Sequence, residues 1–218
     1  MLKYREALRL IPLLQPGDRV LVEYTPDIGL GDFEWKEMVR AFVKDGTVVA
    51  FDFYGIGDLL FRNYIRSLGW KDYKDLIEAK KNIYVFKFGP GGASYGQLMG
   101  EEKIHSDTES FLRSYYSTIR RALNLPRKPK YSFILGLAEY LYFSGKDGLY
   151  NFLHATSTIP LEDWVTFIFL NVGAIGDPER AILEEISSWV LAFRKNGIEV
   201  IKGGRESAHQ GGGEGSAD

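Results

Sequence analysis

Residues 16–33 read PGDRVLVEYTPDIGLGDF, and this stretch decides the fold class. A Pro-Gly turn is followed at 19–25 by a run of β-branched and apolar residues, which predicts a β-strand. Proline, aspartate and glycine then gather at 26–32, which predicts a loop. A helix is expected over 33–44, with apolar side chains on one side, and Asp45-Gly46 ends it. A strand that passes through such a loop into a helix is the repeating unit of α/β proteins.

The same alternation continues along the chain. The run TVVAFDF at 47–53 is apolar almost throughout, which is typical of a strand buried on both faces. Further strands are predicted at 82–88, 131–137, 164–172 and 198–201. Further helices are predicted at 2–14, 57–68, 106–125, 148–155 and 177–195. This order predicts an α/β fold with three layers, in which helices cover both faces of a mostly parallel sheet.

Two of these helices begin with capping signals. Ser106 followed by Glu109 has the spacing of a capping box. Asp177 followed by Pro178 places a side-chain acceptor before a proline at the first helical position. In the first of these helices, a spacing of four residues predicts a buried stripe made of Phe111, Tyr115, Ile119 and Leu123.

Length and composition indicate one ordinary globular domain. No linker interrupts the pattern, so residues 1–202 are predicted to form a single domain, followed by a disordered glycine-rich tail at 203–218. The net charge of -2 offers no global field for nucleic acid or acidic lipid. The absence of cysteine excludes disulfides, thiolate metal sites and a cysteine nucleophile. No apolar run reaches the ~20 residues of a membrane span, so we expect a cytoplasmic protein without a membrane partner.

Several stretches resemble the RecA/KaiC branch of the P-loop ATPases. Residues 16–22 (PGDRVLV) are similar to the turn and strand that precede the phosphate loop in that branch, and 51–54 (FDFY) end a second strand where it often carries acidic residues. Residues 58–63 (DLLFRN) and 66–70 (RSLGW) resemble a KaiC-like helix and the turn that follows it. The match covers roughly residues 16 to 90, and it implies a RecA/KaiC-like fold that assembles through the flanks of its sheet.

The whole chain also resembles a family of hyperthermophilic archaeal proteins. That family has no established function, so the resemblance implies no activity. Scarce Cys, Gln and Met beside plentiful charge agree with a thermophilic source.

The phosphate loop departs from the ATPase pattern G-x-x-x-x-G-K-[ST]. Gly29 and Gly31 retain part of the glycine pattern in the corresponding stretch PDIGLGDF at 26–33. Asp32 replaces the phosphate-binding lysine, and Phe33 replaces the hydroxyl that holds magnesium. Two unit charges ~4 Å apart interact by ~4 kcal/mol at an effective dielectric of ~20, so this reversal of sign replaces attraction with comparable repulsion.

A later strand shows the same loss. The Walker B position requires an acid at the end of an apolar strand, but Leu135-Gly136 stands there. Lysine, hydroxyl and acid are all missing, which argues against a working ATPase. We therefore expect a pseudo-ATPase with no catalytic residue and no cofactor.

Three aspartates are the weak candidates for a metal site. Asp52 ends a central strand, where open α/β sheets bind ligands, but a carboxylate that caps the next helix or pairs with a lysine is the favoured interpretation. Asp27 and Asp32 offer clustered oxygens to a hard cation. A solvated loop in which Asp32 caps the following helix is favoured over that metal site.

Two other segments have a functional and a plain interpretation. The glycine-rich stretch GPGGASYG at 89–96 has the N–H groups to cradle a phosphate, but only Lys87 is near, and a mobile loop is favoured. The densest basic cluster, together with nearby tyrosines, could form a nucleic-acid patch, but a solvated helix end is the favoured interpretation. The cluster comprises Arg120, Arg121, Arg127, Lys128 and Lys130, beside Tyr115, Tyr116 and Tyr131. No metal-ligand spacing links the three histidines, His105, His154 and His209.

The leading hypothesis is a catalytically inactive RecA/KaiC-like domain that acts as a protein- or peptide-interaction module, including self-association. The first alternative is an unconventional metal-dependent nucleotide or phosphoester enzyme that uses Asp27, Asp32 and Asp52. The second alternative is a nucleic-acid-binding protein that uses the basic cluster. The question of enzymatic activity is left open, leaning towards none.

Overall fold

The computed structural model describes residues 8–28, 30–158 and 163–203. In this part of the chain, eight strands form one sheet: β1 (Arg19–Tyr24), β2 (Thr47–Phe53), β3 (Ile83–Phe88), β4 (Gln97–Glu102), β5 (Pro129–Leu135), β6 (Val165–Asn171), β7 (Trp189–Arg194) and β8 (Gly197–Lys202). Their order in the sheet is β4-β3-β2-β5-β6-β1-β7-β8. All neighbouring strands are parallel except β7 and β8, which form an antiparallel hairpin.

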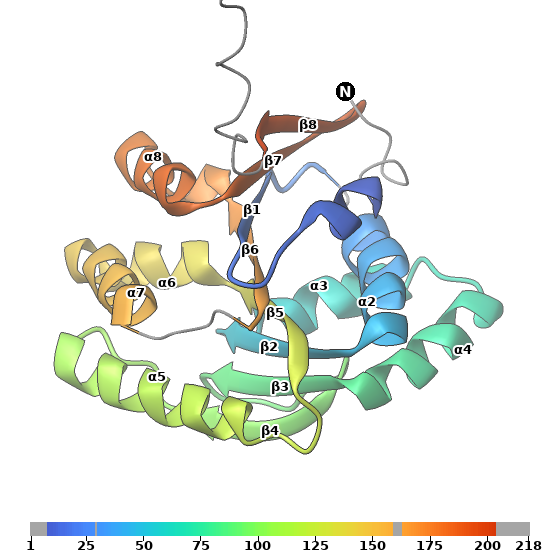
Figure 1. Cartoon of the computed structure of the whole chain (residues 1–218), viewed down its shortest axis with the longest axis horizontal. Helices are drawn as coiled ribbons and strands as arrows, with labels where there is room; N and C mark the ends of the chain where they lie inside the picture. The colour runs from blue at the N-terminus through green and yellow to red at the C-terminus, as the bar shows by residue number, and fades with distance from the viewer. Residues whose placement is uncertain (1–7, 29, 159–162, 204–218) are drawn as a thin grey trace, which may run out of the picture.

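Helices cover both faces of this sheet (Figure 1). One face carries η1 (Leu8–Leu13), the π-helical η2 (Asp32–Met38), α2 (Val39–Asp45), α3 (Ile56–Ile65), α4 (Trp70–Ala79) and the short η3 (Lys80–Asn82). The other face carries α5 (Thr108–Leu123), α6 (Leu137–Ser144), α7 (Lys146–Thr158), the short η4 (Val172–Ala174) and α8 (Asp177–Ile186). The predicted α/β class with a three-layer, mostly parallel sheet is confirmed.

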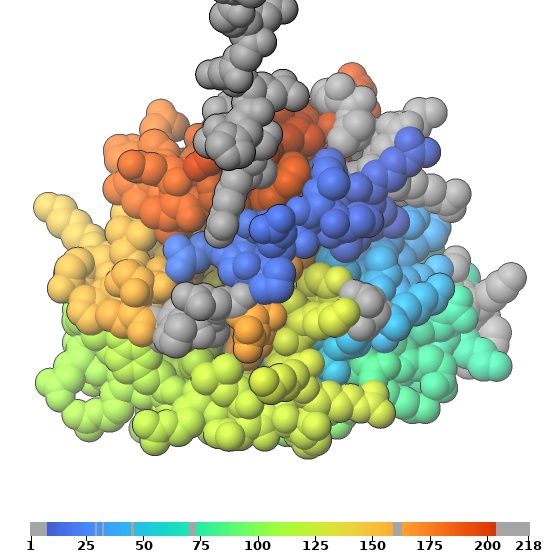
Figure 2. Space-filling model, in the orientation of Figure 1, coloured from blue at the N-terminus to red at the C-terminus, as the bar shows by residue number. Residues whose placement is uncertain are grey.

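The buried strands explain the two hydrophobic cores. In β2, Val48 and Ala50 belong to the core under α2 and α3, while Val49 and Phe51 belong to the core under α5 and α6. Successive side chains of a strand point to opposite faces, so a strand covered on both sides needs apolar residues at every position. On the first face, η1 packs against β7, and it lies beside the C-terminal strands in the space-filling view (Figure 2).

Several predicted elements need correction. The helix predicted over 177–195 is wrong in its second half, because α8 ends at Ile186 and β7 follows as a strand that is buried at five of its six positions. The sequence interpretation also missed α4, β4 and α6. Of the helix predicted over 2–14, residues 2–7 lie outside the described residues, and 8–13 form a 3-10 helix. The predicted tail lies outside the described residues except for Gly203.

The predicted caps also differ from those observed. The side chain of Asp107, rather than that of Ser106, accepts a hydrogen bond from the Ser110 N–H at the start of α5. Asp177 is the first residue of α8 and follows its cap, Gly176. In the predicted stripe of α5, Phe111, Tyr115 and Ile119 are buried, but Leu123 is 50% exposed.

The glycine-rich segment 89–96 is a short crossover whose second half packs against the core, while residues 90–92 are exposed. It joins the parallel strands β3 and β4 with eight residues, although such connections usually need a dozen or more. Tyr95 is fully buried, with its ring 5.0 Å from that of Trp35. Gly96 passes so close to β3 that a Cβ atom there would lie 2.7 Å from the Ile83 carbonyl oxygen. The short crossover is therefore held by its own buried side chain.

Candidate functional site

A cleft of about 490 Å³ opens at the carboxyl edge of the sheet, and we call it the carboxyl-edge cleft. Tyr24 and Asn171, which are register partners at the ends of β1 and β6, line its floor. One wall comes from α3 and another from the loop after β1, while α6 contributes Glu139. Ligands of open α/β sheets bind at this edge, so this cleft is the first candidate for a functional site.

The lining of the carboxyl-edge cleft is mainly apolar. Its apolar side chains are Pro26, Ile28, Leu30, Ile56, Leu59 and Leu60. Glu139 supplies the one carboxyl group among the described lining residues, and none of these residues is a lysine or arginine. Burial raises the pKa of Glu139, although its own backbone and the Asn171 side chain act in the opposite direction through hydrogen bonds. The cleft therefore offers apolar contact and a hydrogen-bonding carboxyl group, without a cation for phosphate.

The loop after β1 has the position of a phosphate loop but uses its N–H groups internally. Ile28 donates its N–H to the Thr25 carbonyl, and Leu30 donates to the Ile28 carbonyl. Phe33 and Glu34 both donate to the Leu30 carbonyl. A phosphate loop instead directs such N–H groups at its ligand.

The degenerate phosphate-loop residues have separate surroundings. Gly31 lines the cleft, and a Cβ atom there would lie 2.9 Å from the Tyr64 Cβ. Phe33 is buried with its ring centroid 4.8 Å from that of Phe193. Gly29 and the side chain of Asp32 lie outside the described residues.

Asp27 lies in an exposed part of the same loop. Its carboxylate accepts a hydrogen bond from the Thr25 hydroxyl and lies 3.4 Å from Lys195 Nζ. These two interactions, the Thr25 bond first, lower the pKa of Asp27. Among the described residues, no group of three or more His, Asp or Glu side chains could hold a metal ion.

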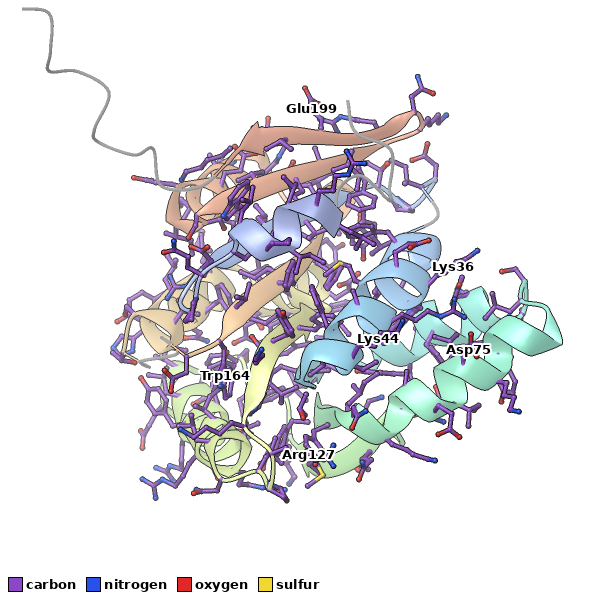
Figure 3. All side chains as sticks on the ribbon, turned by 45° about the vertical axis from the view of Figure 1, so that its right-hand side comes forward. Lys36, Lys44, Asp75, Arg127, Trp164 and Glu199 are labelled. Carbon is purple, nitrogen blue, oxygen red and sulfur yellow. The ribbon has the colours of Figure 1, made fainter. Side chains whose placement is uncertain are left out.

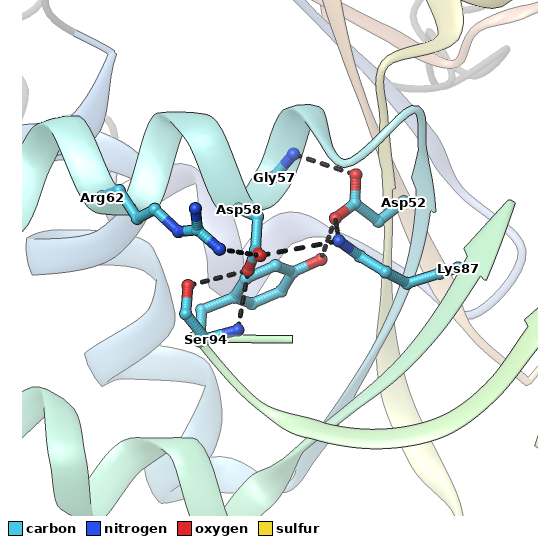
Figure 4. A network of polar contacts seen from close by, with 7 residues as sticks. Asp52, Gly57, Asp58, Arg62, Lys87 and Ser94 are labelled. Atoms are coloured by element: carbon cyan, nitrogen blue, oxygen red, sulfur yellow. Dashed lines mark hydrogen bonds and ion pairs between the residues drawn. The ribbon is translucent and has the colours of Figure 1, made fainter. Parts of the chain in front are cut away.

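Asp52 lies in a buried polar network rather than in the cleft (Figure 4). One carboxyl oxygen accepts the Gly57 N–H at 2.9 Å, and the other accepts the Tyr95 hydroxyl at 3.2 Å. Lys87 Nζ lies 3.4 Å from Asp52 and 3.6 Å from Asp58, and all three side chains are buried. Burial raises the pKa of Asp52, although the hydrogen bond from the Gly57 N–H and the charge of Lys87 act to lower it. Asp52 thus both caps α3 and pairs with a lysine, as the favoured interpretation had it.

Asp58 extends this network to the crossover. It accepts hydrogen bonds from the N–H and the hydroxyl of Ser94, both at 2.7 Å, and from Arg62 at 3.0 Å. The network therefore joins β2, β3, α3 and the crossover, and it fixes the helix that forms one wall of the cleft. Lys87 was noted in the sequence only as a possible phosphate ligand, but it serves this internal network.

Glu34 is a buried carboxyl group that the sequence interpretation missed. It lies in the π-helical η2 with no exposed surface, and no described residue forms a hydrogen bond with either carboxyl oxygen. Burial, followed by the nearby charge of Asp52, raises the pKa of Glu34 well above its usual value. The neutral form is therefore favoured in the folded chain. In the sequence, the only sign that Glu34 would be buried was its position between two aromatic residues at the start of a helix.

The basic cluster predicted between 120 and 130 is divided in the structure. Arg121 donates hydrogen bonds to the Met99 carbonyl and to the Glu102 carboxylate, both in β4, whereas Arg127 donates to the Asn82 side chain, directly before β3. Tyr115 and Tyr131 are buried, so neither offers a face for stacking on a base. His209 lies outside the described residues, and no described helix is long and apolar enough to cross a membrane.

No family model and no curated protein sequence matches this chain. Among solved structures, PH0250 from Pyrococcus horikoshii OT3 is similar over 94% of this chain and 94% of its own, with a TM-score of 0.70 and 18% identity. PH0321 from Pyrococcus horikoshii, solved in complex with an unknown peptide, is similar over 93% and 92%, with a TM-score of 0.57 and 18% identity.

A third solved structure, the ATPase domain of another protein, is similar over 87% of this chain and 78% of its own. Its TM-score of 0.47 and identity of 12% are too low to carry an argument about this chain. At the identities of the two Pyrococcus proteins, the likeness concerns the fold alone, and the chain shares its fold with PH0250 and PH0321.

Proposed function

We propose that the chain is a RecA/KaiC-like domain without a working nucleotide site, which binds a peptide segment of a partner protein in the carboxyl-edge cleft. The composition of this cleft carries the proposal: its described lining is mainly apolar, with a few neutral polar side chains, one carboxyl group and no cation. Phosphate sites need cations or free N–H groups, and the loop beside the cleft and the start of η2 together use four N–H groups internally. Peptide sites need apolar surface with a few polar groups to fix orientation.

Exposed aromatic side chains extend this apolar surface. Tyr142 and Phe143 are 68% and 66% exposed, and their rings lie 5.2 Å apart. The ring of Tyr54 lies 5.3 Å from that of Phe143. We call these three residues the aromatic rim. Tyr142 and Phe143 lie three and four residues after Glu139 on α6, so the rim continues the helix face that borders the cleft.

The backbone at Tyr54 adds a second sign of function. This residue has a φ of 56°, the one positive φ at a described non-glycine position. Such a conformation costs about 1–3 kcal/mol and concentrates at binding sites. Here it turns the chain from β2 into α3, two residues before Ile56, which lines the cleft.

The structure of PH0321 in complex with an unknown peptide is consistent with this role. A peptide with apolar residues and one basic residue fits the proposed site, because the apolar walls surround the single carboxyl group of Glu139. Aromatic anchors of the rim would supply contact area at low entropic cost.

The test is a selection of phage-displayed random peptides on the immobilised full chain, followed by fluorescence anisotropy titrations of the selected peptides. We expect Leu59→Glu to weaken their binding about tenfold or more, because burying one leucine contributes roughly 1.5–3 kcal/mol. Leu59 lines the cleft and is 53% exposed, so the variant should fold.

The matched control is Leu123→Glu, which alters a leucine that is 50% exposed on α5, away from the cleft. It should leave peptide binding unchanged. Equal loss in both variants, or no selected peptide at all, would refute the proposal. Displacement of a selected peptide by magnesium-ATP would instead favour the alternative of a nucleotide enzyme.

A further inference from the structure

A second cleft, of about 880 Å³, lies at the opposite edge of the sheet, and we call it the amino-edge cleft. It is bounded by α2 and α4, and by the residues that directly precede β3 and β5. Figure 3 shows Lys44 at the end of α2, Asp75 on α4 and Arg127 below them on one side of the molecule. Nothing in the proposed peptide site uses these residues.

The amino-edge cleft is cationic. Four cations line it, namely Arg40, Lys44, Lys81 and Arg127, against two carboxylates, Asp75 and Glu78, so the formal balance of 4 − 2 is +2. This excess stands out on a chain whose net charge is -2. The cleft is therefore positively charged, although the chain as a whole carries a net negative charge.

The two carboxylates each pair with one of these cations. Arg40 lies 3.1 Å from Asp75, and Lys81 lies 2.8 Å from Glu78. Arg127 donates a hydrogen bond to the neutral side chain of Asn82 at 3.1 Å. Within the described part of the chain, no carboxylate lies within ion-pair distance of Lys44 or Arg127. These two cations are the uncompensated ones.

A helix dipole explains only part of this arrangement. Lys44 lies in the last turn of α2, where a cation is favoured by the helix carbonyl groups. Arg127 lies between α5 and β5 and belongs to no helix. The two positive groups nevertheless line the same cleft from separate elements, and the neutral side chains of Val43 and Ala79 line it as well.

We propose that the amino-edge cleft binds a small molecule that carries a di- or triphosphate group. Arg127 and Lys44 hold separate phosphate oxygens, because a guanidinium matches phosphate geometry and an ammonium acts as a point charge. The non-phosphate part of the ligand lies against Val43 and Ala79. The volume of the cleft falls within the usual range for small-molecule sites, roughly 300–1,000 Å³.

The test is isothermal titration of the full chain with sodium tripolyphosphate, and separately with ATP in the presence of EDTA, both at low salt. We expect Lys44→Glu and Arg127→Glu each to weaken binding about tenfold or more, because each change removes a charge-assisted contact and adds repulsion. The controls are Lys36→Glu, on the preceding π-helical segment, and Lys128→Glu, beside Arg127, because neither residue lines the cleft. Both controls should retain at least most of the affinity.

The two probes separate the possible ligands. Equal affinity for tripolyphosphate and ATP means that the phosphates alone are recognised, whereas tighter binding of ATP means that the apolar wall contributes. Absence of binding for both probes at millimolar concentration overturns the proposal, and so does equal weakening by the cleft variants and the controls. Leu59→Glu must leave these affinities unchanged, so failure here and failure of the peptide proposal are distinguishable.

Discussion

The carboxyl-edge cleft and the amino-edge cleft lie at opposite edges of the sheet, and their linings also differ in charge. At the carboxyl edge, where parallel sheets commonly receive phosphates, the described lining has an apolar surface and a single carboxyl group. At the amino edge, four cations surround the cleft. The contrast shows that strand direction determines where a cleft can form, while the side chains at the ends of the elements determine what it can bind.

The largest expected effect comes from the network that holds α3, and with it the wall of the carboxyl-edge cleft. Lys87→Met leaves Asp52 and Asp58 buried without their shared cation, so we expect the free energy of unfolding to fall by about 3–5 kcal/mol. Urea denaturation measures this loss. Arg62→Met removes the half-exposed partner of Asp58 and should cost about 0–1 kcal/mol. Similar losses in both variants would contradict the assigned role of Lys87.

The next effect concerns Glu34 and its dependence on pH. The folded chain raises the pKa of Glu34 above its usual 4.5, so the folded state binds the proton more tightly than the unfolded state does. This contribution to stability is complete below that usual value and declines as the pH rises towards the raised pKa. Glu34→Gln removes the ionisation, and we expect it to raise the free energy of unfolding at pH 8 by about 1 kcal/mol or more.

Urea denaturation between pH 4 and pH 9 checks this prediction. The two curves should converge at low pH, where Glu34 is protonated in both states. The exposed Glu101 on β4 provides the control, since Glu101→Gln should run parallel to the unaltered chain. A stability gain that is the same at every pH would show that ionisation of Glu34 is not its cause.

A smaller effect tests the reach of the peptide site beyond the cleft. Tyr142→Ser should weaken the binding of a selected peptide by about 1 kcal/mol, because it removes one exposed aromatic contact. Tyr150→Ser on α7 removes a tyrosine of similar exposure outside the rim, and it should have no effect. Anisotropy titrations of both variants measure the difference. If both or neither weaken binding, the rim is not part of the site.

The smallest expected effect is that of magnesium. The amino-edge cleft offers cations to the phosphates directly, so adding magnesium should not strengthen ATP binding. Titrations with magnesium and with EDTA should give dissociation constants that agree within about twofold, a difference of about 0.4 kcal/mol. Binding that requires magnesium would contradict direct recognition of the phosphates by the cations of the amino-edge cleft.

The sequence predicted the central strands well because their burial leaves a direct mark. The run at 47–53 coincides with β2, since every position of a strand covered on both faces must be apolar. The same property misled the interpretation of β7: its six residues follow an acidic helix without a glycine or proline between them, so the apolar run was assigned to the helix. The sequence lacked a glycine or proline that would have marked the boundary between α8 and β7.

The candidate sites were less predictable because they depend on contacts between distant segments. Asp52 and Lys87 are register partners on β2 and β3, and their equivalent positions at the ends of two apolar runs were a signal that the pair would meet. Glu139 and Lys44 carry no such pattern, because each acquires its surroundings only when helices pack. The charge of the cleft at each edge of the sheet could therefore not be predicted from the sequence and became visible only in the structure.

The crossover between β3 and β4 determines which positions can change during evolution. The strand β4 has no fully buried position of its own, whereas Tyr95 in the crossover is completely enclosed and Ser94 bonds to Asp58. The edge strand is thus anchored through the segment that precedes it. Selection can alter the exposed side chains of β4, such as Leu98 and Glu101, to suit a new neighbour or to discourage aggregation, provided that Tyr95 and the narrow passage at Gly96 are retained.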